Sequence, residues 1–299
     1  MLLEPLVSVI IPVYNDLERL QTCLEALEKQ TYPRNRYEVI AVDNGSDKSI
    51  EPLVHHFSQA IATSESKPGS YAARNKGLSL AKGEIIAFTD ADCIPAQNWI
   101  ERGVDTLLRE TNCGLVGGKV EIFFRDASQP TAVELYERLV AFPQQRYVEV
   151  ERFSVTANLF TSKTVLEKVG HFSDTLKSSG DSDWGKRVFT AGYRLVYADD
   201  VRVAHPARHS FNELRKQKVR LVGGWRDRDK RSTSSKIAAS AVSIVRDLLP
   251  PVGFVSRVSS DKKLKGFVQK SSVVFVHVRV KYSRAAERLR LQLGGESQR

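Results

Sequence analysis

Residues 84–95 read Glu-Ile-Ile-Ala-Phe-Thr-Asp-Ala-Asp-Cys-Ile-Pro, a short apolar run followed directly by two aspartates. The run from Ile85 to Phe88 is typical of a buried strand, and it stops at Thr89. Asp90 and Asp92 therefore stand at the carboxyl end of that strand. Because ligands of open α/β sheets bind in the crevice beyond this end, the stretch predicts an α/β sheet with acidic side chains at its ligand-binding edge.

The spacing of the two aspartates fits a metal site. Carboxylates separated by one residue in an extended turn can present oxygens to one hard divalent cation, which keeps its other positions for water and phosphate oxygens. A diphosphate is the natural partner of such a site. The alternative is a simple turn, because Asp is common where strands end. Asp90 and Asp92 alone leave both interpretations open.

The chain before this stretch alternates between strand and helix patterns. Strands are predicted at 7–11, 37–42 and 60–63, and helices at 15–30, 49–57 and 70–81. This alternation predicts a doubly wound α/β fold. The turn Pro12-Val13-Tyr14-Asn15 lacks a G-x-G-x-x-G motif, which disfavours a dinucleotide fold and a P-loop. Asp43, at the end of the second strand, is placed to accept hydrogen bonds from a ribose or a base.

Charge is distributed unevenly along the 299 residues. Residues 1–200 hold 22 Lys/Arg and 28 Asp/Glu, whereas residues 201–299 hold 23 and 7, a net charge of +16. The basic part predicts an anionic partner, either a membrane surface or nucleic acid. No apolar run reaches the length of a spanning helix, and the N-terminus has no signal-like segment, so we expect a cytoplasmic protein. Three cysteines without metal-type spacing are expected to be reduced thiols.

Four segments, in this order, resemble the signatures of family 2 glycosyltransferases of the GT-A fold. They are Val-Ile-Ile-Pro-Val-Tyr-Asn at 9–15, Val-Asp-Asn-Gly-Ser-Asp at 42–47, Ala-Arg-Asn-Lys-Gly at 73–77 and Phe-Thr-Asp-Ala-Asp at 88–92. The resemblance covers residues 5 to about 225. It implies a doubly wound, mixed but mainly parallel sheet flanked by helices. It also implies an inverting enzyme of cell-surface polysaccharide synthesis that moves a sugar from a nucleoside diphosphate, with UDP favoured, to a saccharide or lipid-linked acceptor.

The resemblance also assigns the binding residues. The nucleotide-sugar would be bound by Pro12, Tyr14, Asp43, Arg74, Asp90 and Asn158, and Mn²⁺ or Mg²⁺ by Asp90, Asp92 and His205. Taken without the resemblance, the alternatives are a helix-surface charge for Arg74, a turn residue for Asn158 and a structural histidine for His205. The family usually has a second acid where this chain has Asn44.

Residues 180–187, Gly-Asp-Ser-Asp-Trp-Gly-Lys-Arg, resemble the family's base motif at the start of a helix. Transfer to a hydroxyl requires that its proton be removed as the phosphate leaves, and one carboxylate can do this. Asp181 is the candidate base, and a single displacement without a covalent intermediate implies inversion. Asp183 is interpreted as structural, since acids favour a helix N-terminus. Family members commonly have Glu where this chain has Gly180.

We expect residues 1–229 to form the catalytic domain and residues 230–299 a basic amphipathic helical region. That region is predicted to lie on an anionic membrane surface, which would make the protein peripheral at the inner face. A solvated helical appendage is the alternative. A sugar-1-phosphate nucleotidyltransferase would carry a glycine-rich basic loop after the first strand, which is missing here. Nucleic-acid binding is disfavoured because the basic region lacks interleaved aromatic residues.

Overall fold

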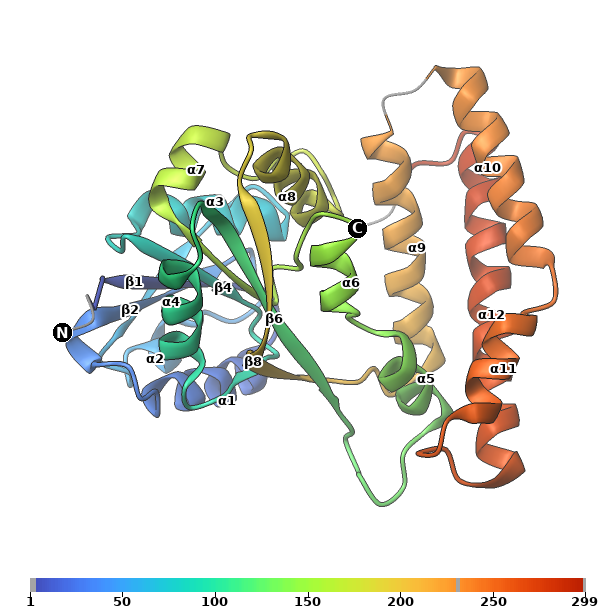
Figure 1. Cartoon of the computed structure of the whole chain (residues 1–299), viewed down its shortest axis with the longest axis horizontal. Helices are drawn as coiled ribbons and strands as arrows, with labels where there is room; N and C mark the ends of the chain where they lie inside the picture. Colours follow the sequence, from blue (N-terminus) through green and yellow to red (C-terminus); the bar gives the residue numbers. More distant parts are fainter. Residues whose placement is uncertain (1–3, 230–231, 298–299) are drawn as a thin grey trace. The chain divides into compact units, whose positions relative to one another are not determined.

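The computed structural model describes residues 4–229 and 232–297, and the chain forms two compact units (Figure 1). The first, here called the sheet unit, comprises the residues up to Glu121 together with Phe142–Thr175 and Gly180–His205. The second, the helical unit, comprises Ile122–Ala141, Leu176–Ser179 and the residues from Pro206 onward. Every residue predicted to bind substrate or metal lies in the sheet unit.

Within the described residues, eight strands form one sheet in the order β3-β2-β1-β4-β7-β6-β8-β5. They are β1 (Val7–Val13), β2 (Tyr37–Asp43), β3 (Ala60–Ser64), β4 (Ile85–Thr89), β5 (Ile94–Pro95), β6 (Cys113–Phe123), β7 (Asn158–Ser162) and β8 (Arg194–Pro206). The first four pair in parallel, and β7 is antiparallel to both β4 and β6. The predicted mixed α/β sheet is confirmed.

Helices cover both faces of this sheet (Figure 1). Side chains alternate along a strand, so Val9 and Ile11 of β1 pack with α1, α2 and α4, whereas Ile10 packs with α3, α7 and α8. The bounds are α1 (Leu17–Glu28), α2 (Glu51–Val54), α3 (Ser70–Leu80), α4 (Trp99–Arg109), α6 (Gln144–Glu149), α7 (Lys163–Val169) and α8 (Gly180–Thr190), with a 3₁₀ turn at Arg34–Arg36. Fully buried Trp99 and Trp184 anchor the two faces.

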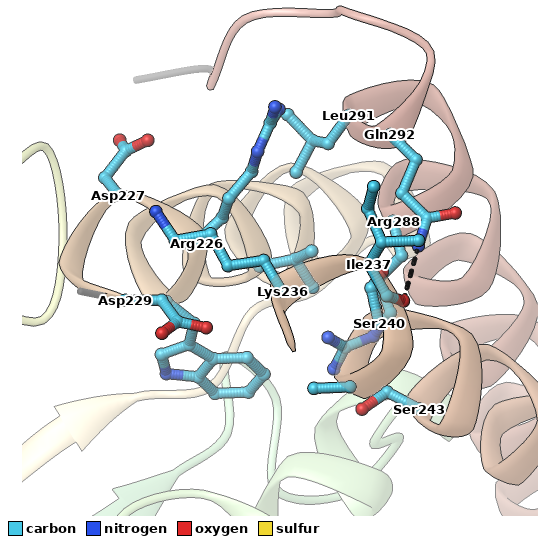
Figure 2. A pocket seen from close by; sticks show the side chains of 13 residues that line it. Arg226, Asp227, Asp229, Lys236, Ile237, Ser240, Ser243, Arg288, Leu291 and Gln292 are labelled. Carbon is cyan, nitrogen blue, oxygen red and sulfur yellow. Dashed lines mark hydrogen bonds between the residues drawn. The ribbon is translucent and has the colours of Figure 1, made fainter. Parts of the chain in front are cut away.

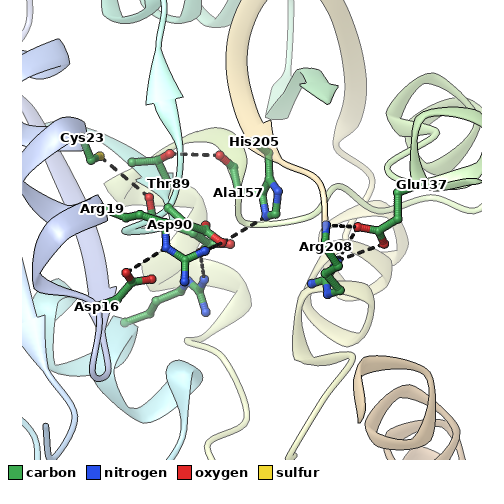
Figure 3. Close-up of polar contacts among 11 residues, drawn as sticks. Asp16, Arg19, Cys23, Thr89, Asp90, Glu137, Ala157, His205 and Arg208 are labelled. Carbon is green, nitrogen blue, oxygen red and sulfur yellow. Dashed lines mark hydrogen bonds and ion pairs between the residues drawn. The ribbon is translucent and has the colours of Figure 1, made fainter. Parts of the chain in front are cut away.

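The helical unit has its own apolar core. Its helices are α5 (Ala132–Val140), α9 (Phe211–Arg228), α10 (Thr233–Leu248), α11 (Val252–Ser260) and α12 (Gly266–Gln292). Helix α12 packs against the other four, and its Val273, Val276 and Val280 meet Leu214 of α9. In the same unit, Arg208 forms an ion pair with buried Glu137 at 3.1 Å (Figure 3).

Two expectations about the C-terminal part are corrected. The predicted boundary at residue 230 lies outside the described residues. Helix α9, which was expected in the catalytic domain, packs in the helical unit. The reason is that the apolar side of α9 is buried against α12. The apolar run at 273–280 and the helix predicted at 283–293 form one continuous helix, α12.

Candidate active site

The carboxyl ends of β1, β2 and β4 place their polar residues at one edge of the parallel part of the sheet. Val13 pairs in register with Asp43, and β4 lies on the other side of β1. Pro12 is half-buried, and Tyr14 is 65% exposed. The Asp43 carboxylate accepts a hydrogen bond from the Ser46 amide at 3.0 Å. These residues form the predicted donor side of the site.

Asn44 holds the loop after β2 against the start of α3. Its amide nitrogen donates to the carbonyls of Glu65 and Lys67, both at 2.9 Å, and its amide oxygen accepts from the Gly69 N–H at 2.6 Å. An ionised carboxylate accepts hydrogen bonds but cannot donate them, whereas an amide does both. The amide at position 44 therefore has a structural role that an acid would not fill.

Arg74, on α3, reaches the first aspartate of the Asp-x-Asp pair. Its side chain is 3% exposed, and it forms an ion pair of 2.5 Å with the Asp90 carboxylate. The Nε of Arg74 is buried and has no hydrogen-bond partner among the described residues. Arg74 is therefore not a helix-surface charge. It is a buried cation that lies beside an acid.

Tyr71 links this pair to the predicted base. One turn before Arg74 on α3, its ring lies under the guanidinium, with 5.7 Å to the ring centroid, and its hydroxyl donates to the Asp181 carboxylate at 3.3 Å. The same carboxylate oxygen accepts from the Ser182 N–H at 2.8 Å. Burial raises the pKa of Asp181, against the lowering effects of Ser182, Arg74 and Tyr71. A raised carboxyl pKa suits a general base that works near neutral pH.

Gly180 makes room for the Tyr71 ring. A Cβ atom at this position would lie 2.7 Å from the ring, closer than real contacts allow. The tyrosine ring thus fills the space that a larger residue before Asp181 would need. Asp183, by contrast, pairs with Arg187 one turn along α8 at 3.1 Å. This contact agrees with the structural interpretation of Asp183.

Asp92 and His205 come together because the short strand β5 pairs with β8. Ile94 is opposite Ala204, and this register leaves His205 Nε2 3.4 Å from the Asp92 carboxylate. Burial raises the pKa of Asp92, while His205 opposes that effect. Arg19, from α1, lies 3.8 Å from the same carboxylate. Figure 3 shows this neighbourhood, with Arg19, Asp90 and His205 labelled.

The acids and the imidazole are chemically suitable for a divalent cation, since carboxylate oxygens are the ligands that Mn²⁺ and Mg²⁺ prefer. A buried carboxylate with a raised pKa, as at Asp92, is also a place where an added positive charge is favourable. The part of the chain that the structure describes nevertheless contains no group of three His, Cys, Asp or Glu side chains gathered as metal ligands. Asp90 instead pairs with Arg74. The donor set thus fits a cation that takes its other ligands from a bound diphosphate.

Asn158 does not belong to this site. Its side chain is fully buried, accepts from the Trp99 indole N–H at 2.9 Å, and donates to the carbonyls of Lys119 at 2.8 Å and Val201 at 2.9 Å. Both amide protons are used within the protein. The predicted donor contact of Asn158 is therefore wrong, because the residue joins α4, β6 and β8 in the core.

Sequence reasoning overlooked two features of the site. Tyr71 stands outside the quoted motifs, although its spacing of three from Arg74 places both on one side of α3. The strand β5 is only two residues long and carries no periodic signal.

The predicted free thiols are confirmed, and Cys23 and Cys93 are buried.

The sequence matches the model of Glycosyl transferase family 2 over residues 8–170. Glycosyltransferase AglE of Haloferax volcanii is 44% identical over 225 residues, which cover 74% of this chain and 73% of AglE. A Methanococcus voltae enzyme, dolichyl N-acetyl-alpha-D-glucosaminyl phosphate 3-beta-D-2,3-diacetamido-2,3-dideoxy-beta-D-glucuronosyltransferase, is 23% identical over 71% of this chain and 70% of its own.

A solved structure has the same fold. Mannosyltransferase PcManGT from Pyrobaculum calidifontis, in complex with GDP-Man and Mn²⁺, superposes with a TM-score of 0.63 at 18% identity, covering 96% of this chain and 88% of PcManGT. The fold is thus the GT-A fold of glycosyltransferases. Together with the family match over more than half of the chain and the identity to AglE, it shows that the chain belongs to glycosyl transferase family 2 and is an enzyme of glycan biosynthesis.

Proposed function

We propose that the enzyme transfers a sugar from a nucleoside-diphosphate sugar to a hydroxyl of a lipid-linked saccharide, with inversion at the anomeric carbon. The observation that carries this proposal is the chain of contacts from Asp181 through Tyr71 and Arg74 to Asp90. It links a buried carboxylate suited to removing a proton with an acid and a cation suited to a diphosphate. The M. voltae relative, whose name specifies a dolichyl phosphate sugar, supports a lipid-linked acceptor.

The donor would bind along the carboxyl ends of β1, β2 and β4. Tyr14 offers an exposed ring for a base, Asp43 a carboxylate for the ribose, and Arg74 a positive charge for the phosphates. A ring that is 65% exposed beside a nucleotide site has surface to lose on binding. Pro12 would form the floor of this part of the site.

Asp90 and Asp92, with His205 beside Asp92, would hold Mn²⁺ or Mg²⁺. When bound, such a cation neutralises the negative charge that develops on the leaving diphosphate. That PcManGT contains Mn²⁺ with its GDP-Man supports this assignment. The role of Arg74 is then to orient the Asp90 carboxylate through their ion pair.

Asp181 acts on the acceptor. Its carboxylate takes the proton from the attacking hydroxyl while the acceptor oxygen bonds to the anomeric carbon and the bond from that carbon to the diphosphate oxygen breaks on the opposite face. Burial raises the pKa of this carboxyl, which increases its affinity for the proton. Tyr71 keeps the carboxylate in place through its hydroxyl.

Calorimetric titration with UDP-, GDP- and dTDP-sugars, each with Mn²⁺ and with excess chelator, tests the donor assignment. We expect metal-dependent binding of one nucleotide class, with UDP as the favoured one. The Asp92→Asn variant should lose this binding, whereas Asp105→Asn on α4 should keep it. Equal binding with and without chelator would contradict the metal site, and binding of no nucleotide sugar by the folded protein would contradict the donor class.

A further inference from the structure

Helix α10 of the helical unit is amphipathic in the opposite sense from a helix of a water-soluble core. The side that packs inward carries the polar residues Lys236, Ser240, Ser243 and Asp247, which recur at helical spacing, together with half-buried Ala239 and Ile244. Asp247 is 3% exposed and forms ion pairs with Arg284 at 2.9 Å and Arg288 at 3.4 Å, both on α12. Among the described residues, none of α10 belongs to the apolar core of the unit.

Polar contacts also fix both ends of α10 to α12. The Gln292 side-chain amide donates to the Ile237 carbonyl at 3.2 Å, and the Lys281 ammonium donates to the Leu249 carbonyl at 2.6 Å. Figure 2 shows the first of these contacts. Lys236, Ser240 and Ser243 of α10 and Arg288 of α12 line a pocket of about 530 Å³. The contacts that hold α10 to α12 thus include polar ones at both ends and at Asp247.

Large apolar side chains are exposed on α10, on α11 and in the turn between them. We call this surface the apolar strip; its members are Val242, Val245, Leu248, Leu249, Val252 and Val255, which are 69%, 58%, 54%, 56%, 73% and 40% exposed. In water, such an arrangement leaves apolar area hydrated while it buries charge, the reverse of what the hydrophobic effect favours. It is the arrangement expected of a helix whose outer side lies in lipid.

The charges around the strip indicate which surface it fits. Arg246 is exposed at the edge of the strip, and Lys262, Lys263 and Lys265 are exposed in the turn after α11. The acidic residues between 232 and 265, Asp247 and Asp261, are both paired with arginines. The outward charge of this segment is thus positive, which complements anionic lipid headgroups.

The length and bend of the segment favour an in-plane position. Within residues 4–229 and 232–297, no single helix meets the length and hydropathy of a membrane span, although Ser234–Leu248 and Val252–Ser260 meet them jointly across a bend of 47°. Interfacial helices place their apolar side at the boundary of headgroups and acyl chains. We infer that α10 and α11 lie in the surface of an anionic bilayer, with the apolar strip among the acyl chains and the lysines at the headgroups.

Cosedimentation of the full chain with vesicles tests this inference without donor or acceptor, so the result is independent of the proposed transfer reaction. We expect binding to vesicles that contain phosphatidylglycerol and much weaker binding to pure phosphatidylcholine. Val245→Asp/Leu248→Asp should weaken binding more than about tenfold, because Asp is costly in an apolar lipid environment. Changing Lys262, Lys263 and Lys265 to Gln should weaken it about 100-fold, at about fivefold for each charge.

Leu108→Asp provides the matched control, because Leu108 on α4 is 54% exposed, as Leu248 is, but lies outside the strip. This variant should bind vesicles like the unchanged chain, and circular dichroism should show all variants folded. Failure of the full chain to bind anionic vesicles would overturn the inference, as would equal loss in the Leu108 control. Self-association that is abolished by Val245→Asp/Leu248→Asp, without vesicle binding, would instead make the strip an interface between two copies.

Discussion

Replacing Asp181 by Asn removes the proposed base while it preserves the surrounding contacts. The carboxylate oxygen that accepts from Ser182 at 2.8 Å and from Tyr71 at 3.3 Å is replaced by an amide oxygen, which accepts equally well. The amide cannot take a proton at neutral pH. Because a positioned general base contributes about 10²- to 10⁴-fold, kcat should fall by that factor, equivalent to about 3–5 kcal/mol of transition-state stabilisation.

Donor affinity and stability should respond differently from kcat. The contacts found among the described residues link Asp181 to Tyr71, and Tyr71 to Arg74 on the donor side. Because this link is indirect, the Kd for the nucleotide sugar should stay within a few-fold. A carboxyl whose folded-state pKa is raised by burial stabilises the fold at low pH, and this contribution is lost as pH rises through that pKa. Asp181→Asn should therefore raise the free energy of unfolding at neutral pH.

Initial rates with the donor found by calorimetry and a lipid-linked acceptor measure the first effect, and urea unfolding at several pH values measures the second. Asp183→Asn, on the same helix turn, is the matched control and should keep most of its activity. Retention of more than about a tenth of kcat by Asp181→Asn would refute the base assignment. A fall in donor affinity as large as the fall in kcat would refute the separation of base and donor residues.

Three further predictions test the interior of the sheet unit. Tyr71→Phe should move the acidic limb of the pH–rate profile to higher pH, because the Tyr71 hydrogen bond lowers the pKa of Asp181 and its loss would raise that pKa. An unchanged profile would contradict this. Gly180→Ala, whose Cβ would meet the Tyr71 ring at 2.7 Å, should reduce kcat at least as much as Tyr71→Phe, with full activity as the contrary result. Asn158→Ala should lower the free energy of unfolding in urea by about 1–3 kcal/mol, because it leaves the buried Trp99 N–H without its acceptor, yet should leave donor affinity unchanged. A donor-specific loss would restore Asn158 to the site.

Much of the site was predictable from local sequence. A strand ends where its apolar run ends, so the positions of Asp43, Asp90 and Asp92 at one sheet edge followed from alternating strand and helix patterns. The motif at 180–187 begins a helix, as expected for acids near a helix N-terminus. Such features depend on a few neighbouring residues, and the chain carries that information directly.

Contacts between distant segments were decided only by the tertiary structure. Tyr71 meets Asp181 across 110 residues, and His205 reaches Asp92 through a strand of two residues, so neither contact has a local pattern. The burial of Asn158 and of Asp247 on α10 has the same origin, because the sequence specifies two sides of an element but packing decides which side faces the protein. The sequence by itself thus determined the elements and the chemistry at their ends, and the tertiary structure decided which side chains share a site, because that depends on how the elements pack.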